Sequence, residues 1–127
     1  RNASCSGLSI FLVDALRAAG LPARLAGVPQ WNTPEGGNHN WVEVWISGEW
    51  HFLGASEPDP QGLDHAWFFP QPVTKAVPGG GLRSVYAASW KPTPDGLHFP
   101  LYYDLTKRWV HAYDVTSTYV EHAANAM

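Results

Sequence analysis

Three residues of types that can together perform nucleophilic catalysis follow one another in the first half of this 127-residue sequence. Its single cysteine is Cys5, and His39 and Glu57 follow later in the chain. A cysteine becomes a nucleophile when a base takes its proton, and an acid can then hold that base in the useful tautomer. The pattern therefore predicts a site in which Cys5 attacks a carbonyl carbon, with His39 as the base and Glu57 as the orienting acid.

The segment that follows Cys5 has the periodicity of an amphipathic helix. Ser4 is a good N-cap and Gly20 a good C-terminal stop. The apolar positions have the three-four spacing of one helix face: Leu8, Phe11, Leu12, Ala15, Leu16 and Ala19. Cys5 would then lie in the first turn, where free backbone N–H groups and the helix dipole favour a thiolate. A lone cysteine can also be a small buried hydrophobe, but two flanking serines and a glycine argue against that alternative.

The strand signals come next and place His39. Residues 23–28 are predicted to form a short strand. The alternating runs 39–46 and 49–53 flank a Ser-Gly dipeptide, which predicts a β-hairpin with His39 at the beginning of its first strand. The loop of residues 29–38 between these strands is rich in Pro, Gly, Asn and Thr, and it is a candidate cleft wall.

The hairpin register predicts which acid His39 meets. If Ile46 pairs with Glu49, His39 lies opposite Ser56 and next to Glu57. A one-residue bulge at Gly54 would move Glu57 directly opposite His39. Asp59 has the same strand parity and is the alternative acid; Glu57 is favoured because it is nearer to the predicted register of His39.

Large aromatic side chains are abundant, with seven Trp, five Tyr and five Phe. So many rings in a small chain predict an aromatic core and a ring-lined cleft. The residues predicted to line a substrate cleft are Trp31, Asn38, Trp41 and Trp67. For Trp31 and Trp67 the competing interpretation is a packing role in the loop or core.

Composition excludes several other classes of function. The net charge of −3 offers no basic surface for nucleic acid, and no apolar run approaches the length of a membrane span. The remaining histidines lack metal-ligand spacing: His51, His65, His98, His111 and His122. We therefore expect no metal and no cofactor. One cysteine does not identify the cellular compartment, although an extracytoplasmic location is compatible with a fragment of a longer protein.

The rest of the chain is predicted to complete a single domain. Residues 70–81 read as a long connection, 82–90 and 109–115 as strands, and Tyr119-Val120 as part of a strand leading out of the domain. We expect a catalytic core over residues 1–120, with residues 121–127 a C-terminal tail or linker stub.

A family resemblance rests on four motifs in fixed order. They are Cys5, the run Gly37-Asn38-His39-Asn40-Trp41-Val42-Glu43-Val44, the run Gly48-Glu49-Trp50-His51-Phe52, and Glu57-Pro58-Asp59. From Cys5 to about Phe69 the chain resembles the transglutaminase-like superfamily. The resemblance implies a papain-like α+β fold, in which an N-terminal helix carrying the cysteine packs on an antiparallel β-sheet. It also implies further chain before Cys5 and further domains of a longer parent protein.

Carried over by position, the resemblance makes Cys5 the nucleophile, His39 the base and Glu57 the acid. The family more often has Asp shortly after a tryptophan such as Trp50, and Gly54 stands where that Asp is expected. The implied activity is acyl transfer through a thioester. We expect hydrolysis of an amide or peptide bond in a peptide or protein substrate, because a short chain leaves the cleft open to water. The alternative is a catalytically silent module that binds peptide or glycan in a Trp-rich cleft.

Overall fold

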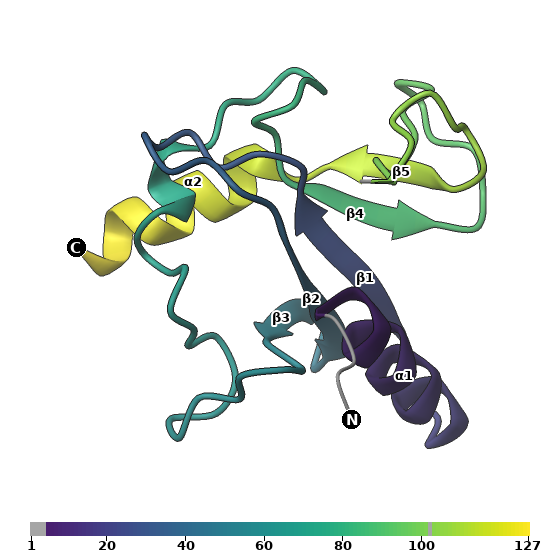
Figure 1. Ribbon diagram of the computed structural model, residues 1–127. Helices are drawn as coiled ribbons and strands as arrows, with labels where there is room; N and C mark the ends of the chain where they lie inside the picture. The colour runs from purple at the N-terminus through teal and green to yellow at the C-terminus, as the bar shows by residue number, and fades with distance from the viewer. Residues whose placement is uncertain (1–4, 102) are drawn as a thin grey trace. The chain divides into compact units, whose positions relative to one another are not determined.

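The computed structural model describes residues 5–101 and 103–127 and has an α+β architecture (Figure 1). An N-terminal helix is followed by five strands, a short 3-10 helix and a C-terminal helix. Their bounds are α1 (Cys5–Ala18), β1 (Ala23–Val28), β2 (His39–Ile46), β3 (Glu49–Leu53), η1 (Val73–Lys75), β4 (Tyr86–Ser89), β5 (His111–Asp114) and α2 (Thr116–Ala126). The predicted α+β class is thereby confirmed.

The strands have the hydrogen-bonded order β3-β2-β1-β4-β5, and the pairs β2–β3 and β4–β5 are antiparallel. The chain divides into two compact units. The first contains the residues up to Ala26 together with Asn40–Trp67, and the second contains Gly27–His39 together with Phe68–Met127. The first unit therefore holds α1 and the hairpin, whereas α2, β4 and β5 belong to the second.

Helix α1 ends as the sequence predicted, with Gly20 immediately beyond its last turn. Gly20 has a φ of 89°, which lies in the left-handed region that glycine adopts without a Cβ penalty. The N–H of Leu21 donates to the carbonyl of Leu16 at 3.0 Å, and the N–H of Gly20 donates to the carbonyl of Arg17 at 3.0 Å. This pair of bonds is a Schellman cap, which satisfies carbonyls that the helix end leaves open. The predicted N-cap, Ser4, lies outside the described residues.

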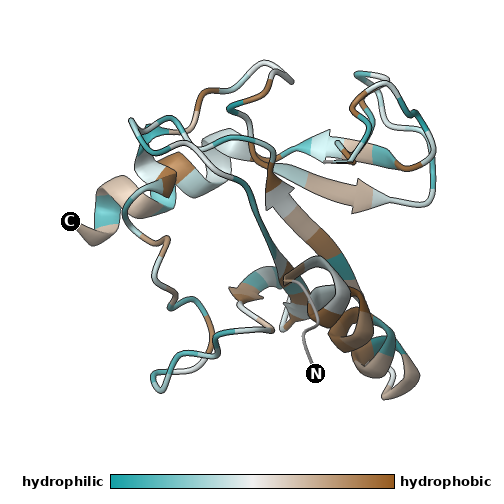
Figure 2. Ribbon diagram, in the orientation of Figure 1, coloured by the Kyte–Doolittle hydropathy of each residue, from teal (hydrophilic) through white to brown (hydrophobic). Residues whose placement is uncertain are grey.

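The first unit is held together by an apolar cluster between α1 and the strands. Val13 of α1, Ala23 of β1 and Val42 of β2 are buried in this cluster. Four half-buried apolar side chains surround it: Leu12, Leu16, Leu53 and Ala55. Figure 2 shows the matching hydrophobic colour along α1 and β1. Leu12, Val13 and Leu16 of α1 therefore pack on the sheet within this unit. The predicted apolar stripe is wrong in part, because Phe11 is 72% exposed and Ala15 and Ala19 are exposed as well.

The predicted hairpin forms with the predicted register. Ile46 pairs with Glu49, and the ladder continues to Val42 opposite Leu53. Ser47 and Gly48 both have positive φ, 54° and 86°, which is the geometry of a two-residue type I′ turn. Because β3 ends at Leu53, the expected bulge at Gly54 is wrong: residues 54–57 leave the strand as a loop and do not continue the ladder.

Strand β2 is covered on both faces over most of its length, since every residue from His39 to Val44 is buried. β2 lies between β3 and β1 in the sheet. Its one buried carboxylate is paired: Arg24 Nε lies 2.6 Å from Glu43 Oε1, and the Arg24 guanidinium lies 3.9 Å from the ring centroid of Trp50. A buried charge needs such a partner because desolvation alone is costly.

The second unit corrects two predictions from the sequence. Strands β4 and β5 are shorter than the predicted runs 82–90 and 109–115, although each lies within one of them. Tyr119 and Val120 were expected in a strand but lie in α2, and residues 121–126 are the second half of that helix. The domain boundary at residue 120 stays a prediction, but the expected tail is largely helical.

The Asp114 carboxylate fixes the start of α2 in the second unit. Asp114 Oδ1 accepts the N–H of Thr116 at 3.0 Å. Its other oxygen accepts the N–H groups of Gly79 and Gly80 at 2.8 and 3.0 Å. One side chain thus binds the first residue of α2 and also holds a glycine-rich loop.

The cluster of α1, β1 and β2 generates a stability prediction. Val42 is 0% exposed, so Val42→Ala should leave a cavity and lower the free energy of unfolding by about 2 to 3 kcal/mol. Ile10, on the outer face of α1, is 51% exposed, and Ile10→Ala should change that free energy by less than about 0.5 kcal/mol. Chemical denaturation of both variants measures the difference. Equal losses in the two variants would contradict the packing described here.

Candidate active site

Cys5 is the first residue of α1 and has a half-buried, free thiol. A residue at this position has a backbone N–H without an intrahelical acceptor, because the first four N–H groups of a helix lie before any carbonyl they could reach. The positive end of the helix dipole lies at the same place. Cys5 thus combines a nucleophilic atom with a local environment that favours negative charge.

Asn40 connects the beginning of β2 to the first turns of α1. Asn40 Nδ2 donates to Ser6 Oγ at 2.5 Å, and Ser9 Oγ donates to the carbonyl oxygen of Asn40 at 3.5 Å. Ser9 and Asn40 are both buried, at 0% and 3% exposure. Within the first unit, the residue that follows Cys5 is therefore bonded to the residue that follows His39.

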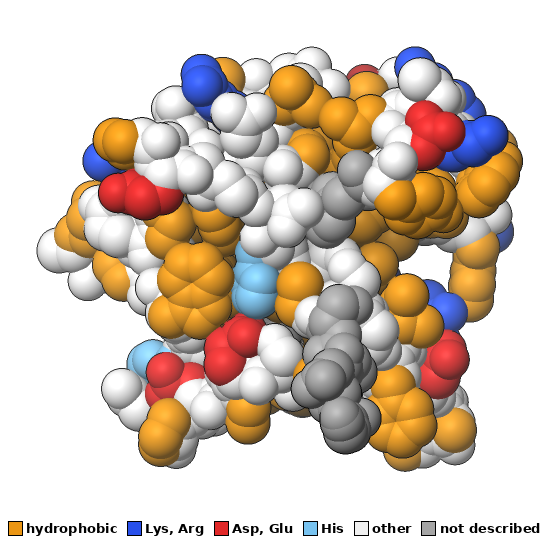
Figure 3. Space-filling view, viewed as in Figure 1, with side chains coloured by type: hydrophobic (Ala, Val, Ile, Leu, Met, Phe, Trp, Pro, Cys, Tyr) orange, Lys and Arg blue, Asp and Glu red, His pale blue; other side chains and the backbone are white. Residues whose placement is uncertain are grey.

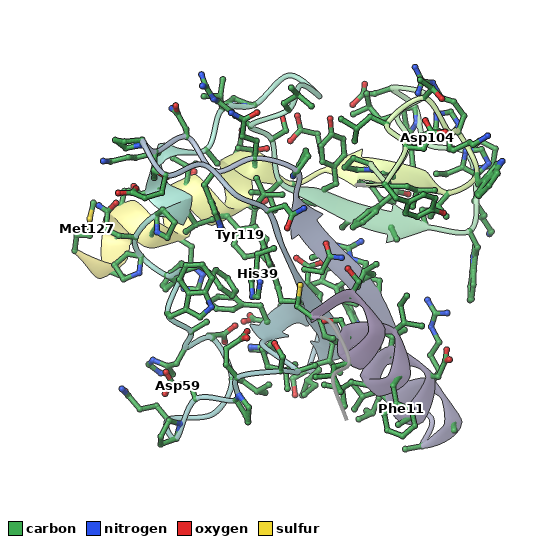
Figure 4. The ribbon with its side chains drawn as sticks, viewed as in Figure 1. Phe11, His39, Asp59, Asp104, Tyr119 and Met127 are labelled. Carbon is green, nitrogen blue, oxygen red and sulfur yellow. The ribbon has the colours of Figure 1, made fainter. Side chains whose placement is uncertain are left out.

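His39 is the first residue of β2 and the last residue of its segment in the second unit (Figure 4). The side chain is largely withdrawn from solvent, because the residue is 6% exposed. Its ring packs against Phe68, with the ring centroids 5.6 Å apart and the planes inclined by 59°. This packing restricts the orientations that the imidazole can adopt.

Glu57 lies in the loop after β3, and its side chain folds back towards the end of that strand. A Cβ atom on residue 54 would lie 2.5 Å from Glu57 Oε1 and 3.3 Å from its Cδ. Real Cβ atoms do not approach another atom so closely, so the carboxylate occupies space that only a glycine at position 54 leaves open. The other oxygen, Oε2, accepts a hydrogen bond from the hydroxyl of Ser56.

Asp59, the alternative acid, is engaged in a local turn. Its Oδ1 accepts the N–H of Gln61 at 2.9 Å, and its carbonyl accepts the N–H of Gly62 at 2.9 Å. Figure 4 shows Asp59 on the outer part of the loop that follows β3. This arrangement is a turn that the Asp side chain stabilises, which gives Asp59 a structural role.

The predicted cleft residues differ in their exposure. Trp31 and Trp41 are buried, at 4% and 0% exposure, and Trp31 stacks on Phe68 with ring centroids 6.1 Å apart. The enclosure of these two rings favours packing roles for them, and their role in a substrate cleft stays a prediction. Asn38 and Trp67 are exposed, and their role in substrate binding stays a prediction.

A histidine–carboxylate pair that sequence analysis missed closes the loop after β3. His51 Nδ1 lies 2.6 Å from Asp64 Oδ2, and the hydrogen bond with Asp64 raises the pKa of His51 above its ordinary value of 6.5. The nearby charges of Asp64 and Glu49 act in the same direction. Sequence spacing gave no signal for this pair, because the contact depends on the path of the whole loop from Gly54 to Leu63.

Two further observations concern the described part of the chain. Among residues 5–101 and 103–127, no group of three or more His, Cys, Asp or Glu side chains could hold a metal ion. No helix in these same residues is both long and apolar enough to cross a membrane.

Figure 3 shows that hydrophobic side chains reach the surface in the second unit near the loop between β4 and β5. Among the described residues of that loop and the adjoining strand, the exposed rings are those of Trp90, Tyr103, Trp109 and Tyr113. Lys107 lies 5.1 Å from the ring centroid of Trp109 and 3.8 Å from the Asp104 carboxylate. These rings were not among the predicted site residues.

A helix-borne cysteine at the first residue of α1, followed by an antiparallel hairpin that begins with histidine, defines a class of α+β protein with a candidate nucleophile at a helix end. In a comparison with protein families, residues 1–55 match the model of the transglutaminase-like superfamily. The resemblance predicted from the sequence motifs is thus confirmed over that stretch. No curated protein and no solved structure matches the chain.

The His51–Asp64 pair generates a titration prediction. Asp64→Asn removes the carboxylate charge, so the pKa of His51 should fall towards 6.5. Because the folded-state pKa is raised, the stabilisation by this pair should be fully present below about pH 6.5 and decline as pH rises through the folded pKa. NMR titration of the His51 ring protons measures the shift, with His65 as an exposed internal reference. An unchanged His51 titration in Asp64→Asn would contradict the pairing.

Proposed function

We propose that this protein is a cysteine-dependent acyl-transfer enzyme that hydrolyses an amide or peptide bond in a peptide or protein substrate. Cys5 is the nucleophile, His39 the general base and acid, and Glu57 the group that orients His39. The single observation that carries the proposal is the position of Cys5 at the first residue of α1, with its neighbour Ser6 hydrogen-bonded to Asn40, the residue next to His39.

The hydrogen bond between Ser6 and Asn40 supports the pairing of nucleophile and base, because Ser6 and Asn40 are their chain neighbours. Cys5 directly precedes Ser6, and His39 directly precedes Asn40, and the side chains of Ser6 and Asn40 are joined by this 2.5 Å bond. Consecutive Cα atoms are only about 3.8 Å apart. A nucleophile and its base must reach hydrogen-bond distance during the reaction. The papain-like arrangement implied by the family has the same two elements, a helix that carries Cys and a strand that carries His.

The place of the Glu57 carboxylate at the end of β3 supports Glu57 as the acid. Gly54 directly follows Leu53, the last residue of β3, which pairs with Val42 of β2. Glu57 brings its carboxylate to within 2.5 Å of where the Cβ of residue 54 would be. The carboxylate thus reaches, from three residues further along the chain, the place where the family more often has an Asp. Asp59 lacks this support because its side chain is used in a turn.

The proposed reaction proceeds in two steps that balance in atoms and protons. His39 takes the thiol proton of Cys5, the sulfur attacks the carbonyl carbon, and the backbone N–H of Cys5 donates to the developing oxyanion. The C–N bond breaks as His39 protonates the leaving amine, which leaves a thioester on Cys5. His39 then takes a proton from water, the hydroxide adds to the thioester, and the C–S bond breaks to release the acid and restore the thiol.

The alternative proposal is a catalytically silent module that binds peptide or glycan. It loses support from the burial of Trp31 and Trp41, which were the central rings of the expected cleft. Thiol reactivity separates the two proposals. An enzyme with the Cys5–His39 pair should be alkylated by iodoacetamide about tenfold faster than its His39→Ala variant at mildly acidic pH, whereas a binding module should show no difference.

A glutamine-containing peptide incubated with a labelled primary amine tests the activity. We expect release of the free acid to exceed incorporation of the amine, because water reaches the thioester in an open site. Cys5→Ala and His39→Ala should each lower turnover by about 10² to 10⁴-fold, with the fold intact by circular dichroism. Efficient amine incorporation with little acid would instead identify a transferase. Activity retained in Cys5→Ala would refute the proposal.

The identity of the acid can be tested by moving it. Glu57→Gln should lower turnover about 10² to 10⁴-fold, because the imidazole loses the carboxylate that orients it and stabilises its charge. In a Glu57→Ala background, Gly54→Asp should restore part of the activity, since the replaced side chain no longer occupies the space near residue 54.

The matched control is Gly54→Asn in the same Glu57→Ala background, which supplies the same shape without the charge. Restoration by Asp but not by Asn supports the assignment of Glu57. Asp59→Asn should leave turnover unchanged within about twofold, because asparagine preserves the turn. A greater loss in Asp59→Asn than in Glu57→Gln would reverse the assignment of the acid.

A further inference from the structure

The loop of residues 54–63, which carries Glu57, is closed at its far end by Asp64. Asp64 makes three hydrogen bonds to β3, all within the first unit. Its N–H donates to the carbonyl of Phe52 at 2.8 Å, and its Oδ1 accepts the N–H of Phe52 at 3.0 Å. Its Oδ2 lies 2.6 Å from His51 Nδ1. One residue thus returns the loop to the strand from which it departed.

The backbone of Asp64 is also unusual. Its φ of 63° lies in the left-handed region, which non-glycine residues rarely adopt and which Asp and Asn tolerate best. A residue held in this region costs free energy, so the surrounding contacts must compensate for it. The three bonds to β3 provide that compensation. Loop ends joined in this way give a compact loop whose interior residues are restricted in where they can lie.

His51 completes the closure from the strand side. Its Nε2 lies 3.6 Å from Glu49 Oε1, so the imidazole is placed between two carboxylates, with Asp64 much the closer. The protonated ring is favoured by both carboxylates and also by a backbone hydrogen bond with Ile46. The pair therefore holds in either state of the ring, because a neutral imidazole can still donate from Nδ1, but it is stronger when the ring is charged.

The interior of the loop shows what this closure restrains. The described hydrogen bonds of Asp59, Gln61 and Gly62 are made within the loop itself. The carboxylate of Glu57 folds back over Gly54, at the near end of the loop. A loop free at its far end would sample many more positions of residues 55–63, and the Glu57 carboxylate would occupy its place over Gly54 for a smaller fraction of the time.

We propose that Asp64, held by His51, is a positioning residue that keeps the loop of residues 54–63 closed and thereby keeps the Glu57 carboxylate at the end of β3. The inference rests on the proposed function for its catalytic consequence, since Glu57 must act on His39 for its position to matter. Asp64 itself touches neither the nucleophile nor the substrate in this scheme. Its effect on catalysis passes entirely through Glu57.

The decisive test is a double-mutant cycle between Asp64 and Glu57. Asp64→Gly removes the carboxylate and suits the left-handed backbone, so it separates the loss of the tether from backbone strain. We expect Asp64→Gly to lower the rate of Cys5 alkylation by iodoacetamide and the turnover number about tenfold, with KM unchanged. In the Glu57→Gln background the same change should have no further effect, because the residue through which it acts is already disabled.

Conservative variants and a pH profile distinguish positioning from a general loss of structure. Asp64→Asn keeps the hydrogen bond from the Phe52 N–H and tolerates the backbone, so it should recover at least half of the lost rate. His51→Gln should remove the part of the pH dependence of turnover that follows His51 ionisation. Asp59→Asn, in the same loop, is the matched control and should leave rate and pH profile unchanged.

Amide hydrogen exchange provides the structural readout and separates the two hypotheses. Exchange at residues 54–57 should be faster in Asp64→Gly than in wild type or Asp59→Asn, whatever the activity. Unchanged exchange there, or effects of Asp64→Gly and Glu57→Gln that multiply, would overturn the present inference. A rate of Cys5 alkylation that does not change in Glu57→Gln would instead refute the proposed function. The effect of Asp64 on catalysis would then be refuted as well.

Discussion

The first unit depends on the hydrogen bonds that Asn40 makes with the beginning of α1. Asn40 begins the part of β2 that belongs to this unit, and it bonds to Ser6 through its side chain and to Ser9 through its carbonyl. Ser9 and Asn40 are buried, so a lost partner would leave a polar group without water, a cost of about 1 to 3 kcal/mol. These hydrogen bonds join the first turns of α1 to the beginning of β2. The apolar cluster around Val13 and Val42 joins the rest of the helix to the sheet.

Local patterns were sufficient to predict the elements of the first unit. The three-four spacing and Gly20 predicted α1, and the Ser47-Gly48 dipeptide between alternating runs predicted both the hairpin and its register. Each of these features is determined by residues close together in the chain: a left-handed glycine ends a helix, and a two-residue turn fixes which residues face each other. The candidate nucleophile and base were therefore placed on their elements from sequence alone.

The features that sequence could not predict all depend on distant parts of the chain. Trp41 was expected in a cleft, but its ring is buried, because both faces of β2 are covered from His39 to Val44. The residue pattern along one strand does not reveal which distant segments cover its faces. Thr116, Thr118 and Val120 favour a strand by propensity, yet Asp114 binds the Thr116 N–H and Tyr119 and Ala123 are buried one turn apart, so a helix forms. The loop path that joins His51 to Asp64 likewise has no local signature.

The contact between Gly54 and Glu57 also limits how this site can change over generations. A side chain at position 54 would displace the Glu57 carboxylate from its folded-back place, because the first added carbon would lie 2.5 Å from an oxygen at the end of a flexible side chain. An acid at position 54 and an acid at position 57 would therefore compete for the same place at the end of β3. A side chain added at position 54 moves the Glu57 carboxylate away from the end of β3, whereas removing Glu57 first leaves that place without an acid. The effect of a substitution at either position therefore depends on the residue at the other.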